Sequence, residues 1–131
     1  MTVLDLKLLE GNFAIHRLAP SADIPVEVYN SSFFSISNTG EELSIVCPGS
    51  LNINSENCDK DWACIKIVGP LRFSLTGILS QLSAVLAKAR ISIFAISTHD
   101  TDYILIKAAK VARAIVALED AGYKFIQDKP L

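Results

Sequence analysis

The sequence predicts an α+β protein built of two tandem units of one strand–connection–hairpin type, the first of them abbreviated. Residues 91–107 of the 131-residue chain hold two runs rich in Ile, Phe and Tyr around a polar centre at 98–102. This pattern is typical of two strands joined by a tight turn. Residues 33–47 repeat it after a shift of 60 positions, which places Phe34 on Phe94, Ile36 on Ile96, Ser37 on Ser97 and Glu42 on Asp102.

A second block repeats in the same order. Residues 13–20 match residues 63–70 after a shift of 50 positions. The two shifts differ because the connection is ten residues shorter in the first half. Two matches in the same order are best explained by duplication, with an abbreviated unit at 1–61 and a complete unit at 62–131.

The first strand of the abbreviated unit is predicted at residues 3–9, where Leu alternates with polar residues. Residues 10–12, Glu-Gly-Asn, have the composition of a hairpin turn and lead into a second strand at 13–18. We therefore expect these two strands to pair with each other.

The rest of the first half leaves little room for a helix. Residues 26–30 accommodate about one helical turn, and residues 33–37 and 43–47 form the first predicted hairpin. Residues 48–61 are polar and are predicted to be a surface connection between the units.

The second half predicts a complete unit. A strand at 64–68 precedes a helix that Ser74 caps and whose apolar residues recur every three or four positions through Ala89. A second amphipathic helix at 111–121 ends at Gly122, and a short strand follows at 123–126. The order is βαββαβ, an antiparallel sheet with its helices on one side. The predicted core contains Ile65, Ile67, Ile78, Leu82, Leu86, Phe94, Ile96, Ile104, Ile106, Ile115 and Leu118.

Composition argues against several classes of protein. Half of the residues are hydrophobic and the net charge is −2 without a basic cluster, which argues against disorder and against nucleic-acid binding. No apolar run approaches the roughly 20 residues of a membrane span, and the N-terminus lacks the pattern of a signal peptide. We therefore expect a cytoplasmic protein that does not bind membranes. Cys47, Cys58 and Cys64 are expected to be buried or semi-buried free thiols, with no metal site and no cofactor.

Residues 69–79 and 96–105 of the second half resemble an ACT domain, a small ligand-sensing module of many amino-acid-responsive proteins. The branch they resemble most is that of small bacterial two-copy ACT proteins related to the eukaryotic cytosolic arginine sensors. The resemblance implies two ferredoxin-like (βαββαβ) units side by side in one sheet, with helices on one side. It also implies a ligand site at the seam between the units and no catalysis by the module itself.

A binding site for an α-amino acid follows from the residues at two places. The start of the predicted helix presents unpaired backbone N–H groups suited to a carboxylate, and Gly77 leaves their approach open. Asp102 offers a partner for an ammonium group. The resemblance matches the ligand-contacting acidic residue of the family to Asp102, and its polar and aromatic neighbours to Thr98, His99 and Thr101. The candidate ligand-binding residues are Ser74, Thr76, Gly77, Ile78, Thr98, His99, Thr101 and Asp102.

Two departures qualify this site. His99 stands where the resemblance leads us to expect an aromatic hydrophobe, and an imidazole both stacks and forms hydrogen bonds. The first unit keeps polar residues at Asn38, Thr39, Gly40 and Glu42 but lacks the helix and its N–H groups. We expect at most one good site per chain, or one shared across a homodimer.

Each of these residues also has a simpler interpretation. Asp100 and Asp102 are both suited to stabilising a hairpin turn, and Gly77 to tight packing of helix on sheet. His99 fits a solvent-facing turn and His16 an ordinary strand position. Trp62 fits a residue that covers the seam, or one that stacks on a ligand.

The predicted function is therefore a non-catalytic, amino-acid-binding regulatory protein, whose ligand shifts its pairing with itself or with an enzyme. The alternative is a structural or protein-interaction module with a degenerate pocket. An enzyme that uses His99, Asp100 and Asp102 is disfavoured, because the two carboxylates stand two residues apart on an exposed hairpin and stay solvated. A homodimer is expected from the apolar composition and the open sheet edges.

Overall fold

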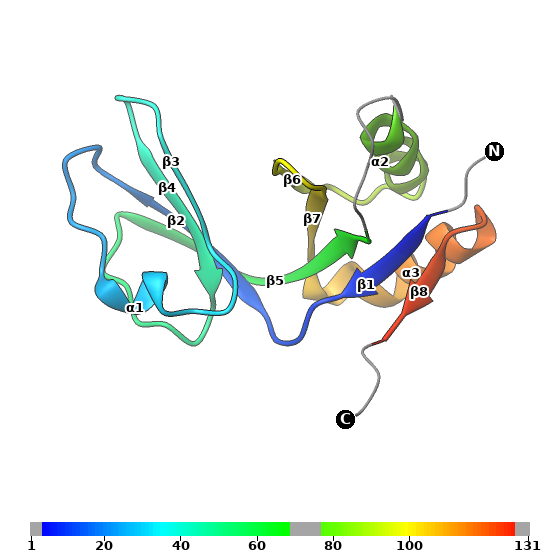
Figure 1. Cartoon of the computed structure of the whole chain (residues 1–131), viewed down its shortest axis with the longest axis horizontal. Helices are drawn as coiled ribbons and strands as arrows, with labels where there is room; N and C mark the ends of the chain where they lie inside the picture. The colour runs from blue at the N-terminus through cyan, green and yellow to red at the C-terminus, as the bar shows by residue number, and fades with distance from the viewer. Residues whose placement is uncertain (1–3, 69–76, 128–131) are drawn as a thin grey trace. The chain divides into compact units, whose positions relative to one another are not determined.

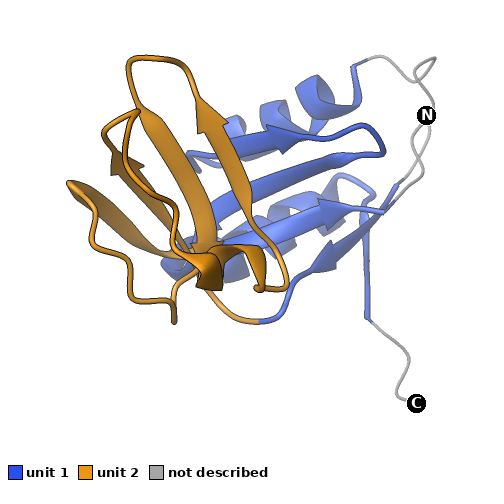
Figure 2. Cartoon of the chain, turned by 60° about the vertical axis from the view of Figure 1, so that its left-hand side comes forward, with its two compact units in different colours: residues 1–10, 63–131 blue, residues 11–62 orange. Residues whose placement is uncertain are grey.

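Figure 1 shows the computed structural model of the chain, in which residues 4–68 and 77–127 are described. The chain divides into two compact units, coloured separately in Figure 2: unit 1 comprises Met1–Glu10 with Ala63–Leu131, and unit 2 comprises Gly11–Trp62. The elements, in chain order, are β1 (Asp5–Leu8), β2 (Phe13–Leu18), α1 (Val26–Tyr29), β3 (Ser35–Asn38), β4 (Leu43–Pro48), β5 (Asn57–Ile67), α2 (Ile78–Lys88), β6 (Phe94–Ser97), β7 (Asp102–Lys107), the 3₁₀ turn η1 (Ala108–Lys110), α3 (Val111–Asp120) and β8 (Lys124–Ile126).

The sheet of unit 1 has the strand order β6-β7-β5-β1-β8. Without β1, this is the order of a βαββαβ unit whose strands are β5, β6, β7 and β8. The N-terminal strand β1 lies between β5 and β8, where it runs antiparallel to β5 and parallel to β8. The sheet is therefore mostly antiparallel, with one parallel pair that the sequence analysis did not anticipate.

The helices α2 and α3 pack on one face of this sheet. Their buried side chains meet every second residue of β1, β5 and β7, as the pleat of a strand requires. The core cluster of unit 1 consists of Leu6, Ile65, Ile67, Leu82, Leu86, Ile91, Ile104, Ile106, Ala114 and Leu118. Its strand residues thus share the helix-facing side of the sheet.

The N-terminal strand corrects the sequence analysis, which assigned residues 1–61 to the first unit and paired the first two strands as a hairpin. Both edges of β1 are occupied by β5 and β8, and both edges of β2 by β4 and β5. The backbone N–H of Leu9 also bonds to the carbonyl of Cys64, 2.9 Å away, so the chain follows β5 instead of turning back. Alternating leucines marked the strand correctly, but they carry no information about its partner.

The sheet of unit 2 has the order β3-β4-β2-β5, and all of its pairs are antiparallel. Its core cluster contains Leu18, Val28, Leu43, Ile45 and Cys47. The single turn of α1 supplies Val28, as the sequence led us to expect of so short a connection.

The polar connection predicted at residues 48–61 is in part a strand. Residues 57–61 belong to β5, where Asn57 pairs with Arg17 and Cys58 with His16. These residues are exposed, and their strand is held by backbone pairing and not by burial of side chains. A search for apolar periodicity cannot find such a strand.

The two predicted hairpins are present, but residues in equivalent positions of the two hairpins are 59 positions apart in the sequence and not 60. Ser35 pairs with Val46 and Asn38 with Leu43 in the first hairpin, whereas Phe94 pairs with Leu105 and Ser97 with Asp102 in the second. Because side chains alternate along a strand, one step of register exchanges the two faces. The match of Phe34 with Phe94 is therefore not a structural equivalence, and Asp102 corresponds to Leu43 instead of Glu42.

Candidate functional site

Four of the candidate residues were predicted at the start of a helix. Ser74 and Thr76 lie outside the described residues. Gly77 is the N-cap of α2, and Ile78 is its first residue. The described part of the helix thus begins three residues later than the apolar pattern from Leu75 indicated.

Gly77 is required by the backbone and not by packing. Its φ is +81°, in the left-handed region that residues with a side chain rarely adopt. A Cβ placed on Gly77 would meet no atom of the described residues, the sheet included, within 4 Å, so the simpler interpretation of close helix–sheet packing is wrong. The first backbone amides of α2 lack partners within the helix, as amides at a helix start do.

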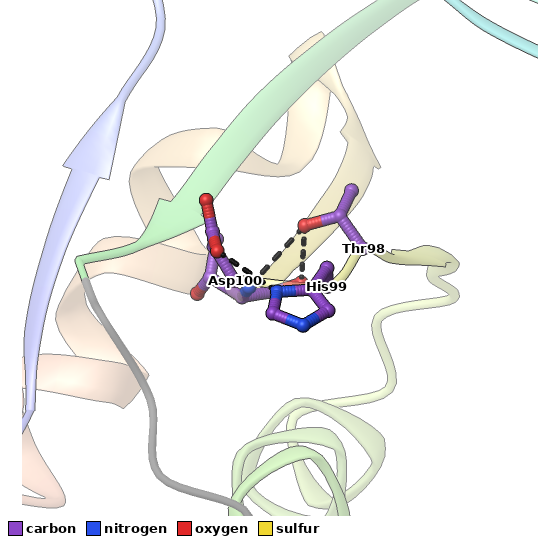
Figure 3. A network of polar contacts seen from close by, with 4 residues as sticks. Thr98, His99 and Asp100 are labelled. Carbon is purple, nitrogen blue, oxygen red and sulfur yellow. Dashed lines mark hydrogen bonds and ion pairs between the residues drawn. The ribbon is translucent and has the colours of Figure 1, made fainter.

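The turn between β6 and β7 is closed by its two threonines, of which Thr98 is labelled in Figure 3. The backbone N–H of Thr98 donates to the carbonyl of Thr101 over 2.8 Å. The Oγ1 of Thr98 also donates to that carbonyl over 3.0 Å and accepts from the N–H of Thr101 over 3.2 Å. These bonds fix the turn without help from either aspartate of the segment.

Thr101 ties this turn to the end of β5. Its side chain is only 4% exposed, and its Oγ1 donates to the carbonyl of Ile67. The single hydroxyl proton is thereby committed to the protein, which leaves only acceptor capacity on that oxygen. The resemblance predicts Thr101 as a ligand contact, and the sequence contains no signal for this long-range bond.

His99 and Asp100 project from the tip of the turn into solvent. Their side chains are 88% and 82% exposed, and His99 Nδ1 lies 3.2 Å from Asp100 Oδ1. A pair so exposed is strongly screened and adds little to stability. The turn needs neither side chain for its own hydrogen bonds, so both remain accessible from outside.

Asp102 differs from these neighbours because it begins a strand. It pairs with Ser97 at the first position of β7 and is half-buried. Along β7 it alternates with Ile104 and Ile106, two members of the core cluster, so its side chain is on the helix-facing side of the sheet.

The start of α2 lies at the same end of unit 1 as Asp102. The bond from Thr101 to the carbonyl of Ile67 places the start of β7 beside the end of β5, and Figure 3 shows the turn there. The chain enters α2 after the end of β5, and the buried residues of α2 face that same sheet. Asp102 and the amides that follow Gly77 therefore share one end and one face of unit 1.

A separate hollow of about 560 Å³ lies at the opposite end of β1, among β1, β8 and α3. Its lining residues are Lys7, Leu8, Leu9, Glu10, Ile115, Phe125, Ile126 and Gln127. None of the candidate residues contributes to it. No sequence pattern indicates this hollow, because it forms only where β1 is inserted beside β8.

No metal centre is found in residues 4–68 and 77–127, where no three His, Cys, Asp or Glu side chains are grouped suitably for an ion. None of the helices in the same residues is long and apolar enough to cross a membrane. The three cysteines are free thiols, as predicted, but only Cys47 and Cys64 are buried, and Cys58 is exposed.

Two family models match the chain. One describes the ACT domain and matches residues 57–120. The other describes an N-terminal domain and matches residues 11–55. No curated protein matches.

Several solved structures resemble the chain over most of its length. Protein Atu0741 from Agobacterium tumefaciens is 33% identical, with a TM-score of 0.88 over 99% of this chain and 97% of that one. The Vibrio cholerae protein VC0802, described as of unknown function and a possible transport protein, is 16% identical, with a TM-score of 0.68 over 89% and 88% of the two chains. The regulatory subunit of aspartate kinase from Thermus flavus is 14% identical, with a TM-score of 0.64 over 92% and 99%. The last two likenesses show the fold alone.

Proposed function

Because residues 57–120 of this chain belong to the ACT domain family, we propose that the protein is a non-catalytic regulatory protein that binds a small molecule, namely an α-amino acid. ACT domains bind small-molecule ligands, and neighbours that are regulatory subunits of aspartate kinase suggest a regulatory role. The observation that carries the proposal is the half-buried Asp102, which shares one end and one face of unit 1 with the start of α2.

The proposed site matches the two charges of an amino acid. The carboxylate of Asp102 accepts hydrogen bonds from the ligand ammonium group, which contribute roughly 1.5–3 kcal/mol if shielded from water. The amides after Gly77 donate to the ligand carboxylate at the positive end of the α2 dipole. Ser74 and Thr76 remain predicted contributors of hydroxyl groups.

The other turn residues have different proposed roles. Thr98 and His99 are exposed and are proposed to contact the ligand side chain, where the imidazole offers both stacking and hydrogen bonding. Thr101 is proposed mainly to position Asp102, because its hydroxyl proton is held by Ile67. The identity of the amino acid therefore depends most on His99.

We further propose that the two units are versions of one ferredoxin-like unit and that the protein forms a homodimer. Strand order supports the first statement: β2, β3, β4 and β5 of unit 2 occur in the same order as the corresponding strands of unit 1 once β1 is set aside. Ligand binding would then change the pairing of the subunits or of a partner enzyme. The location of the site at a seam between units, the cytoplasmic location and the kinship with arginine sensors stay predictions.

Thermal unfolding of the full chain against each of the twenty amino acids tests ligand binding. At about 100 times its dissociation constant, a true ligand raises the free energy of unfolding by about 2.7 kcal/mol. The Asp102→Ala variant should lose this response. Asp100→Ala is the matched control, because Asp100 is two residues away, carries the same charge and projects into solvent. Equal binding by wild type and Asp102→Ala would remove Asp102 from the site.

One observation favours the alternative function of an interaction module. On unit 2, Val26 and Tyr29 of α1 are 64% and 52% exposed, and the ring of Tyr29 meets that of Phe34 edge-on at 5.7 Å. Exposed apolar groups that cluster in this way are typical of docking surfaces. If none of the twenty amino acids shifts the unfolding transition, this alternative becomes the better account.

A further inference from the structure

Unit 2 contains a histidine whose two ring nitrogens both have side-chain partners. His16 lies on β2 with only 3% of its surface exposed. Its Nδ1 is 2.8 Å from the Oγ of Ser55, and its Nε2 is 3.9 Å from the Sγ of Cys58. The order of groups is thiol, imidazole, hydroxyl, which is that of a nucleophile, its base and a group that orients the base.

The backbone holds this arrangement in place. Cys58 is the direct cross-strand neighbour of His16 in the pairing of β5 with β2. The segment before it is fixed to β2 twice, because the N–H of Glu56 donates to the carbonyl of Arg17 and their side chains form an ion pair, each at 3.1 Å. Ser55 is therefore anchored beside the ring that it contacts.

The other two thiols are in environments that suppress reactivity. Cys47 and Cys64 are fully buried, and burial raises the pKa of Cys47 to about 11 and that of Cys64 to about 12. Thiol chemistry proceeds through the thiolate, so neither group reacts readily near neutral pH. Cys58 combines exposure to solvent with contact to a base.

The imidazole has the protonation state that a base requires. Burial, and secondarily the charge of Lys60, lowers the pKa of His16, so the ring is neutral at physiological pH. In the tautomer whose Nδ1–H donates to Ser55 Oγ, Nε2 is the bare nitrogen that faces the thiol of Cys58. Glu56 and Arg17 neutralise each other beside this group.

We propose that Cys58 is a site of reversible S-thiolation, where the thiol exchanges with a low-molecular-weight disulfide and His16 acts as the base. His16 Nε2 takes the thiol proton, and the Cys58 thiolate attacks one sulfur of the disulfide RSSR. An S–S bond forms between Cys58 and RS while the S–S bond of the reagent breaks. The leaving thiolate takes the proton from His16 and departs as RSH, so the step needs no other oxidant.

Thiol–disulfide exchange fits the arrangement of Cys58, His16 and Ser55 better than catalysis or metal binding does. Exchange with a disulfide needs only a nucleophile, a base and access. A metal site needs further ligands, and no suitable set of three is present in the described residues. The site is in unit 2 and uses none of the residues proposed to bind an amino acid, so it stands or falls independently of that function.

Reaction of the native full chain with dithio-bis(nitrobenzoic acid) tests the proposal, with glutathione as a free-thiol reference. We expect one fast thiol that reacts several-fold faster than glutathione, and two slow ones. Cys58→Ser should abolish the fast phase. His16→Gln keeps a hydrogen-bonding group near the thiol but removes the base, and it should slow the fast phase by about tenfold or more.

Ser55→Ala tests the orienting role and is the variant to use if His16→Gln does not fold. It should slow the fast phase less than loss of the imidazole, and Ser55→Thr should restore the rate. Oxidised glutathione should give a single adduct at Cys58, detected by mass spectrometry and removed by reductant. The proposal is overturned if Cys58 reacts no faster than glutathione, if the adduct forms at Cys47 or Cys64, or if folded His16→Gln reacts at the wild-type rate.

Discussion

The two hairpin turns, residues 39–42 in unit 2 and 98–101 in unit 1, share one pattern of hydrogen bonds. In each, the N–H of the leading threonine bonds to the carbonyl three residues on, over 3.1 Å from Thr39 and 2.8 Å from Thr98. In each, the Oγ1 of that threonine accepts a backbone N–H from within the turn. The leading threonine is thus explained in both turns by hydrogen bonds of the turn itself.

The turns differ at the residue that begins the next strand. In unit 2 it is Leu43, which is 2% exposed and belongs to the core cluster, whereas in unit 1 it is Asp102, which is half-buried on the helix-facing side. A carboxylate at an otherwise apolar position is costly unless it has a partner. The comparison therefore singles out Asp102 as the residue that the turn does not explain.

The largest expected effect is the difference in free energy of unfolding between variants at Leu43 and at Asp102. Leu43→Ala should lower the free energy of unfolding by about 2–5 kcal/mol, because it empties part of the unit 2 core. Asp102→Ala should change it by less than about 1 kcal/mol, since no core packing is lost. Urea unfolding of both variants measures the difference. A large destabilisation by Asp102→Ala would show that its carboxylate supports the fold and not a ligand.

A smaller effect is expected at the residue before Asp102. Thr101→Val preserves the shape of the side chain but leaves the carbonyl of Ile67 without its donor, which should cost about 1–3 kcal/mol. Thr101→Ser keeps the hydroxyl and should recover most of that loss. If the Thr101→Val and Thr101→Ser variants have the same free energy of unfolding in urea, the hydrogen bond from Thr101 to the carbonyl of Ile67 does not contribute to stability.

The sequence predicted the elements of this fold better than their partners. Periodicity located α2, α3 and both hairpins, because a buried face imposes its spacing on the residues. It could not show that β1 is inserted between β5 and β8, since strand pairing is a long-range choice that the pattern of a single strand does not encode. The exposed start of β5 was missed for the related reason that its side chains are exposed and show no apolar periodicity.

The candidate site was predictable to a similar degree. Asp102 and Gly77 stood out by residue type, and the structure places Asp102 on the same end and face of unit 1 as the start of α2, which follows Gly77. The internal repeat, however, aligned Asp102 with Glu42, because apolar residues one step out of register still matched. Only the observed pairing shows that Asp102 replaces a core leucine.

Glycine conformation gives the next prediction. Gly77→Ala should destabilise the chain by about 1–2 kcal/mol, because its φ of +81° is strained for alanine although the space is open. Gly49→Ala is the matched control: its Cβ would lie 3.5 Å from the carbonyl oxygen of Asn12, an ordinary contact, and its φ is not in the left-handed region. Equal thermal stability of the two variants would contradict the assigned role of Gly77.

The smallest expected effect is on stability at alkaline pH and comes from two buried thiols, one in each unit. The pKa of Cys47 is raised to about 11 and that of Cys64 to about 12, both mainly by burial, from an ordinary value of 9.0. A thiol with a raised folded-state pKa stabilises the native chain below pH 9.0, and this contribution is lost as pH rises toward the folded-state values. Stability should therefore fall by about 0.8 kcal/mol per thiol at about pH 9.5.

Urea unfolding as a function of pH measures this loss, and alanine variants assign it. Cys64→Ala and Cys47→Ala should each flatten the alkaline decline by one thiol's share. Cys58→Ser should flatten it less than either, because Cys58 is only the lesser cause, after burial, of the raised pKa of Cys47. The decline should continue to higher pH for the Cys64 contribution than for that of Cys47, in keeping with its higher pKa. A decline that Cys58→Ser abolishes would mean that the exposed thiol, and not the two cores, controls the alkaline stability of the chain.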